Sequence, residues 1–211
     1  MAALVLGFAS AVGAAQPVVE ATEAALKEAG SAKAVVLLDV YWARAWRCGQ
    51  FENAQLRSLV FERAPLAAPG EAAAGPTLAL ENPSRLMAPK GYVPYALVIE
   101  PGEYHLTGFE VGFARSVRDV GATVVKRSGA IVNGASRLGH FSAHAGEVVY
   151  LGHFAVDCYR DPIPWRFYSE SGRDLDAQLA EYKDKYPALP IDKVTYRLFS
   201  TTELGTPVDV K

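Results

Sequence analysis

Two strand–turn–strand patterns in the middle of the chain constrain its fold more than any other feature. Residues 95–106 hold two β-rich runs on either side of Pro101-Gly102, and residues 141–152 hold two on either side of Ala145-Gly146. β-Branched and aromatic residues that flank tight glycine-containing turns are typical of antiparallel hairpins. The sequence therefore predicts two β-hairpins within an antiparallel β domain.

The expected register of these hairpins defines the expected core. In the first hairpin, Ile99 faces Tyr104 and Leu97 faces Leu106, which gives one apolar face. In the second hairpin, with Ala145-Gly146 as the loop, the side chains predicted to share the core face are Phe141, Val148, Tyr150, Phe154 and Val156.

The length and the spacing of the patterns favour one β-sandwich domain. The chain has 211 residues, half of them hydrophobic, which is enough for a single core. Short strands separated by Gly and Pro turns, including an apolar run at 34–41, favour a sandwich over an alternating α/β fold. Near the C-terminus, a stripe at helical spacing is followed by Pro187, and its members are Leu175, Leu179, Tyr182 and Tyr186.

The predicted fold is thus mainly β, an antiparallel β-sandwich with one C-terminal amphipathic helix. The sandwich takes up residues 34–200, including a helix at 172–186. Residues 201–211 are expected to form a frayed tail. Residues 16–33 are expected to form a leader or a short helix, because they are rich in Ala and Glu and end near Gly30.

The first 15 residues contain no charge and are typical of the apolar part of a signal peptide. Gly13 and Ala15 would occupy the −3 and −1 positions of the cleavage site, which makes Gln16 the new N-terminus. No Lys or Arg precedes the apolar run, so an upstream start or a buried helix are the alternatives. The sequence predicts a periplasmic or secreted protein with no membrane span after leader cleavage.

The two cysteines, Cys48 and Cys158, lie far apart in sequence and belong to no CxxC pair, which argues against a structural zinc site. In an oxidising compartment the expectation is a Cys48–Cys158 disulfide. Two buried thiols that never meet are the alternative.

The charge balance gives no reason to expect a nucleic acid partner. The formal net charge is −2, whereas nucleic acid binding requires a concentrated basic face. The nearest approach to a basic face is a group of residues with Asp119 among them, which we interpret as a solvated loop or strand edge; it consists of Arg115, Arg118, Lys126 and Arg127.

The histidines offer a weak alternative function as a metal site. Imidazoles are ligands that Zn and Cu accept. His140 and His144 would lie about 13 Å apart along one strand, too far to bind one ion. His140 with His153, on the neighbouring strand of the second hairpin, is the only plausible pair. The main expectation includes no cofactor.

No catalytic motif is present. The sequence lacks a GxSxG elbow and a cysteine next to a histidine in a recognised context. The prediction is therefore a protein that is not an enzyme. A hydrolase with a site assembled from loops is the alternative.

Aromatic and arginine residues around the two cysteines predict a binding surface for another envelope protein or a glycan. This surface would hold Trp42, Trp46, Trp165 and Arg166, which the disulfide would bring together. The alternative is that the tryptophans are buried at one end of the sandwich.

Residues 100–106 and 145–152, together with Tyr186-Pro187 at the end of the helix, resemble a group of uncharacterised bacterial exported proteins and lipoproteins. That group combines a "PG-x-Y-x-L" hairpin with an "aG-x-v-Y-y-G" strand in a transthyretin-like or carboxypeptidase-regulatory-like sandwich. The match covers residues 92–187, although this chain lacks the lipobox cysteine. The resemblance implies a cell-envelope β-sandwich and supplies no catalytic residue. The expected function is a non-catalytic structural or binding role toward another envelope component.

Overall fold

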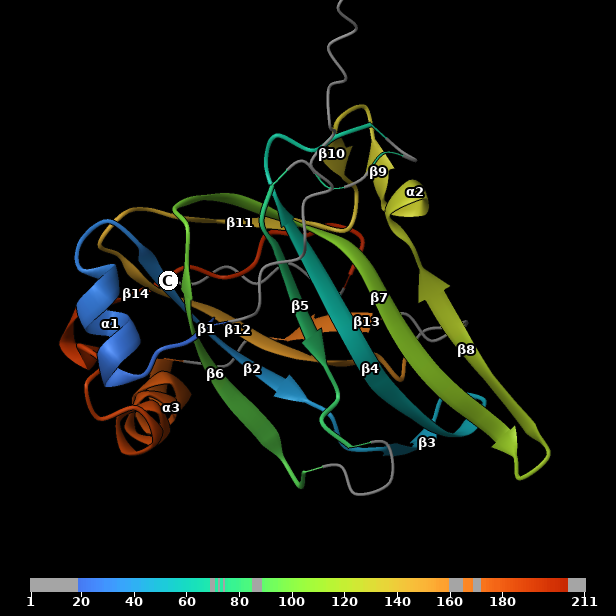
Figure 1. Cartoon of the computed structure of the whole chain (residues 1–211). Helices are drawn as coiled ribbons and strands as arrows, with labels where there is room; N and C mark the ends of the chain where they lie inside the picture. The colour runs from blue at the N-terminus through green and yellow to red at the C-terminus, as the bar shows by residue number, and fades with distance from the viewer. Residues whose placement is uncertain are drawn as a thin grey trace, which may run out of the picture.

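The protein is a mainly β molecule built from two six-stranded sheets (Figure 1). The structure, a computed structural model, describes residues 19–68, 71, 73, 75–84, 89–159, 165–168 and 172–204. The expected signal peptide at 1–15, the cleavage point at Gln16 and residues 205–211 of the tail lie outside the described residues.

The first sheet is built around strands β2 (Ala34–Tyr41) and β12 (Val148–Val156), which run parallel to each other. Strand β14 (Val194–Tyr196) also pairs with β12 in parallel. The remaining strands are antiparallel to their neighbours: β1 (Val19–Glu20), β6 (Tyr92–Ile99) and β13 (Trp165–Tyr168). This sheet therefore contains both parallel and antiparallel pairs, within a fold that is mainly β, as the sequence predicts.

The second sheet is antiparallel throughout and centres on the long strands β4 (Phe51–Arg63) and β7 (Gly102–Ser116). The outer edge of β4 carries β3 (Ala45–Cys48) and β5 (Thr77–Glu81). The outer edge of β7 carries β11 (His140–Ala143) and β8 (Asp119–Val125). A small separate ribbon joins β9 (Ile131–Val132) to β10 (Ala135–Ser136).

The main core lies between the two sheets, which makes the fold a sandwich. Phe61 from the second sheet is fully buried and places its ring edge-on to three other aromatic rings. These belong to both sheets and to the segment after β14, and they are Phe141, Phe154 and Phe199. Each edge-on contact between aromatic rings adds about 0.5–1.5 kcal/mol of stability beyond that from burial of the ring surface.

A second core lies on the other face of the first sheet, under helix α3 (Gly172–Lys185). The helix begins and ends close to the predicted limits, and Tyr182 and Tyr186 from the predicted stripe are buried against Val35 and Tyr150. Both faces of β2 are therefore covered, which explains why its sequence is apolar except for Asp39. Three further helices are short: α1 (Glu23–Ala29), α2 (Arg127–Ala130) and η1 (Ile191–Lys193).

The two predicted hairpins do not exist, because each turn connects strands of opposite sheets. Pro101-Gly102 joins β6 of the first sheet to β7 of the second, and Ala145-Gly146 joins β11 of the second to β12 of the first. The predicted common face of the second hairpin is also wrong. A bulge next to Gly152 shifts the register of β12, so Phe154 faces the sandwich core whereas Val148 and Tyr150 face α3.

The beginning of the expected tail is packed rather than frayed. The Thr201 hydroxyl donates a hydrogen bond of 2.8 Å to the Leu138 carbonyl, and Leu204 is buried in the main core. The Ser200 and His140 backbones also bond to each other, so this segment extends along β11.

Candidate functional site

The fold separates the predicted histidine pair. His140 lies on β11 of the second sheet and His153 on β12 of the first, because the hairpin that would have joined them is absent. The ring beside His140 is that of His105, with 5.6 Å between the ring centroids. Among the residues that the structure describes, no group of three or more metal-ligating side chains could hold a metal ion.

His153 instead lies in a buried polar cluster around Asp39, between the first sheet and α3. Asp39 is fully buried and accepts hydrogen bonds of 2.9 Å from the Tyr150 hydroxyl and from the Gln178 amide. The His153 Nε2 lies 3.5 Å from the Asp39 Oδ2. The Tyr92 ring covers His153 from β6, with a centroid distance of 4.4 Å.

Burial controls the electrostatics of this cluster. Burial raises the pKa of Asp39 from 3.8 to about 7, although the hydrogen bonds from Tyr150, Tyr182 and Gln178 oppose this shift. The pKa of Tyr182 is also raised, first by burial and then by the nearby Asp39 charge. A hydrolase requires a nucleophile that substrate can reach. Asp39, Tyr150 and His153 are all buried, so the cluster suits anchoring of α3 better than catalysis.

The sequence contains one signal that could have revealed this cluster. Asp39 is a lone carboxylate inside an eight-residue apolar strand, and carboxylates are rarely buried without partners. The partners of Asp39 come from β12 and α3, more than 100 residues away in the chain. The sequence around Asp39 therefore does not indicate which residues they are.

The Cys48–Cys158 disulfide is present, as predicted. It links the end of β3 in the second sheet to the segment that follows β12 in the first, with 4.5 Å between the two Cα atoms. The disulfide therefore joins the two sheets of the sandwich.

The four residues of the predicted binding surface fall into three different settings. Trp42 is fully buried, and its Nε1 donates a hydrogen bond of 2.8 Å to the Tyr95 hydroxyl, so Trp42 belongs to the core and not to a surface. Trp46, four residues further on, is 67% exposed. Trp165 and Arg166 lie on β13, which pairs with β12, and their side chains lie outside the described part of the structure.

Trp46 lies in a groove on the outer face of the second sheet, which we call the Trp46 groove. The groove has a volume of about 340 Å³. In the sheet register, Trp46 is opposite Asn53, Asn53 opposite Ala114, and Ala114 opposite Val120, so these four side chains form one row across β3, β4, β7 and β8. The other residues of the groove used below are Arg44, Arg57 and Val117.

Arginine side chains form part of the groove. The Arg44 guanidinium lies over the Trp46 ring, 5.6 Å from its centroid, in cation–π geometry. Arg57 forms an ion pair of 2.7 Å with Glu110 and lies across Gly112, where it leaves no room for a Cβ atom. An exposed Trp with flanking arginines has the composition of an interaction surface.

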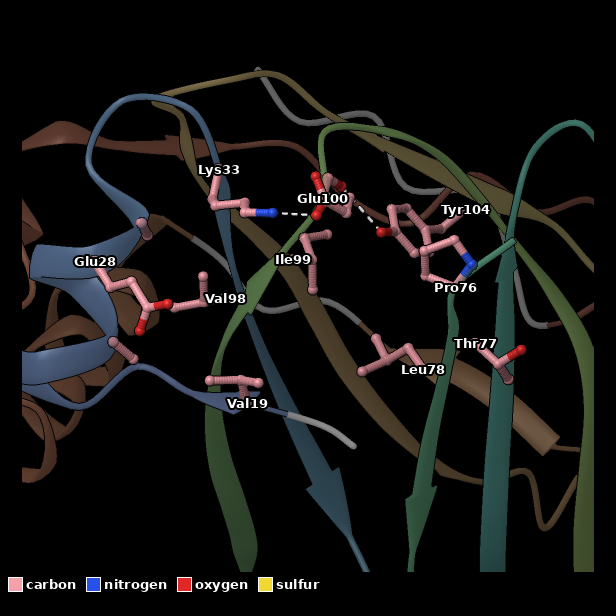
Figure 2. A pocket seen from close by; sticks show the side chains of 12 residues that line it. Val19, Glu28, Lys33, Pro76, Thr77, Leu78, Val98, Ile99, Glu100 and Tyr104 are labelled. Atoms are coloured by element: carbon pink, nitrogen blue, oxygen red, sulfur yellow. Dashed lines mark hydrogen bonds and ion pairs between the residues drawn. The ribbon is translucent and has the colours of Figure 1, made fainter. Parts of the chain in front are cut away.

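A second pocket, of about 270 Å³, lies where α1 meets the ends of β5 and β6. Figure 2 shows that Leu78, Val98 and Ile99 point into it, whereas Lys33 and Glu100 meet in an ion pair at its rim. The Tyr104 hydroxyl donates a hydrogen bond of 2.9 Å to the Glu100 carbonyl and closes one side. This volume is smaller than that of most ligand sites.

Comparison of the chain with protein-family models, with curated proteins and with solved structures finds no match. The resemblance to exported proteins of the cell envelope therefore stays a prediction. None of the helices that the structure describes is long and apolar enough to span a membrane.

Proposed function

We propose that this chain is an exported, non-catalytic protein of the cell envelope that binds a protein partner through the Trp46 groove. The observation that carries the proposal is the 67% exposure of Trp46, which lies in one row with Asn53, Ala114 and Val120 on the outer face of the second sheet. Large exposed aromatic residues are common at the centre of protein interfaces.

The disulfide and the leader support the location. Structural disulfides form and persist in oxidising compartments, which fits a periplasmic or secreted protein. The charge-free first 15 residues and the resemblance to exported proteins agree with this location.

Two exposed valines in the groove favour a protein partner over a glycan. Val117 and Val120, at the far end of the groove, are 93% and 63% exposed. Exposed aliphatic side chains on the same sheet face as an exposed aromatic ring suit the apolar centre of a protein interface. The polar groups that also line the groove, among them Arg44, Glu52 and Asn53, suit the polar rim of such an interface.

The test is photocrosslinking in the host cell, with a benzophenone amino acid in place of Trp46. We expect one discrete crosslinked protein, because the side chain at position 46 would lie inside the interface. The matched control carries the same amino acid in place of Val132, which is also half-exposed but lies on the separate β9–β10 ribbon. Equal crosslinking from both positions, or attachment to glycan alone from position 46, would contradict the proposal.

A further inference from the structure

Strand β8 forms a free edge of the second sheet. It pairs with β7 and with no other strand that the structure describes, and in Figure 1 no labelled strand lies along its outer side. An edge strand presents backbone N–H and C=O groups that can pair with another extended segment. The β7–β8 hairpin also projects beyond the rest of the sheet (Figure 1).

The side chains of this edge are apolar on the face that carries the Trp46 groove. Val120 and Val124 point to that face and are 63% and 51% exposed, with Ala122 between them. Val117 lies next to the strand in the turn from β7. The row from Trp46 ends at Val120, so a strand added to β8 would continue the row by one position.

Positive charges lie at both ends of this strand. Arg118 immediately precedes β8 and Lys126 immediately follows it, and both are exposed. Neither has an ion-pair partner among the residues that the structure describes. The neighbouring Arg115 and Arg127 are paired instead, with Asp119 at 3.7 Å and with Glu62 at 2.9 Å respectively. The basic residues noted in the sequence therefore surround a strand edge, in a chain of formal net charge −2.

These charges distinguish between two occupants of the edge. In a symmetric antiparallel pair of two β8 strands, the register that places Val120 opposite Val124 of the second copy also places Arg118 opposite Lys126. Like charges that face each other across a strand pair are destabilising. An acidic segment would instead place a carboxylate opposite each of these cations.

We infer that β8 receives an extended, acidic segment of the partner protein as an added strand, with β-branched side chains on the face of the Trp46 groove and carboxylates near both ends. Backbone hydrogen bonds along the edge supply affinity, and the alternate side chains and the end charges supply specificity. The inference deepens the proposed function and relies on it for the identification of this face as the binding face.

The test is binding of a fluorescein-labelled peptide, Glu-Glu-Val-Thr-Val-Thr-Val-Glu-Glu, to the oxidised full-length protein by fluorescence anisotropy. The comparison peptide has Lys at the four terminal positions. We expect the acidic peptide to bind at least about tenfold more tightly, and the double variant Arg118→Glu, Lys126→Glu to reverse this preference. Both substitutions are at exposed positions outside the strand, so the fold is preserved.

A third peptide tests strand addition separately from charge. It has the acidic sequence with N-methyl groups on every second backbone nitrogen, so that one edge of the extended peptide cannot donate hydrogen bonds. A fourth peptide carries the N-methyl groups on the other edge. We expect one of the two to lose binding and the other to keep it, because only one peptide edge pairs with β8.

Three outcomes would overturn the inference. They are equal binding of acidic and basic peptides, equal binding of the two methylated peptides, and a dimer of the protein itself that blocks the peptide. Its failure is distinguishable from failure of the proposed function. Discrete crosslinks from position 46 without peptide binding would refute only the strand addition, whereas peptide binding without those crosslinks would refute the proposed protein-binding role of the Trp46 groove.

Discussion

Reduction of the Cys48–Cys158 disulfide is expected to lower the free energy of unfolding by about 4 kcal/mol. The disulfide closes a loop of 110 residues and connects the two sheets. In the chain-entropy account, a cross-link over a loop of this length removes a large number of conformations from the unfolded state. The measurement is urea unfolding of the oxidised and the reduced protein, followed by far-UV circular dichroism.

The double variant Cys48→Ala, Cys158→Ala is the control for this prediction. Its stability should match that of the reduced protein and should not change when reductant is added. Equal urea midpoints for the oxidised and the reduced wild type would show that the cross-link contributes nothing to stability.

The second large effect concerns Asp39 and pH. The pKa of this carboxyl is about 7 in the folded protein, whereas an aspartate exposed to solvent in the unfolded chain has the ordinary value of 3.8. Folding therefore favours the protonated form. Between these two values the folded protein binds more protons than the unfolded chain. The contribution of Asp39 to stability is therefore fully present below about pH 4 and is lost as the pH rises to about 7, at about 1.4 kcal/mol per pH unit.

The Asp39→Asn variant isolates this contribution. The free energy of unfolding of the wild type, minus that of the variant, should fall by about 4 kcal/mol between pH 4 and pH 8. The groups that face Asp39 are Tyr150 and His153 from β12 and Gln178, Glu181 and Tyr182 from α3. Glu181→Gln is the control, because it removes only a charge that slightly raises the same pKa and should keep most of the slope. Parallel stability curves for wild type and Asp39→Asn would refute the assignment.

The alternation of apolar residues identifies the side chains of the core but not the neighbours of each strand. Leu97, Ile99, Tyr104 and Leu106 are all buried in the main core, although the hairpin predicted to contain them is absent. A turn that crosses between two packed sheets places inward-facing residues opposite each other, as a hairpin does. Local sequence therefore does not distinguish the two connections.

Strand β12 shows a second limit of the pattern. Its residues from Val148 to Phe154 are all buried, because the sandwich core covers one face and α3 covers the other. Burial of both faces removes the alternation of apolar and polar residues. The sequence pattern therefore does not reveal the bulge next to Gly152, which changes the face to which the following side chains point.

The sequence around the two tryptophans indicates which of them belongs to the binding surface. Trp42 directly follows the mostly apolar run of β2, which indicates burial, whereas Trp46 lies between Ala45 and Arg47 on the short strand β3. The row from Trp46 to Val120 depends on strand pairings between residues far apart in the chain, and these come only from the fold.

The most direct test of the account is a native mass measurement of the protein purified from the envelope fraction of its own host. We expect a chain that begins at Gln16, is two hydrogens lighter than the reduced form, and carries a bound protein partner. A reduced chain with its first 15 residues intact in the cytosolic fraction would contradict the account, as would a stoichiometric metal or small-molecule adduct in place of the partner.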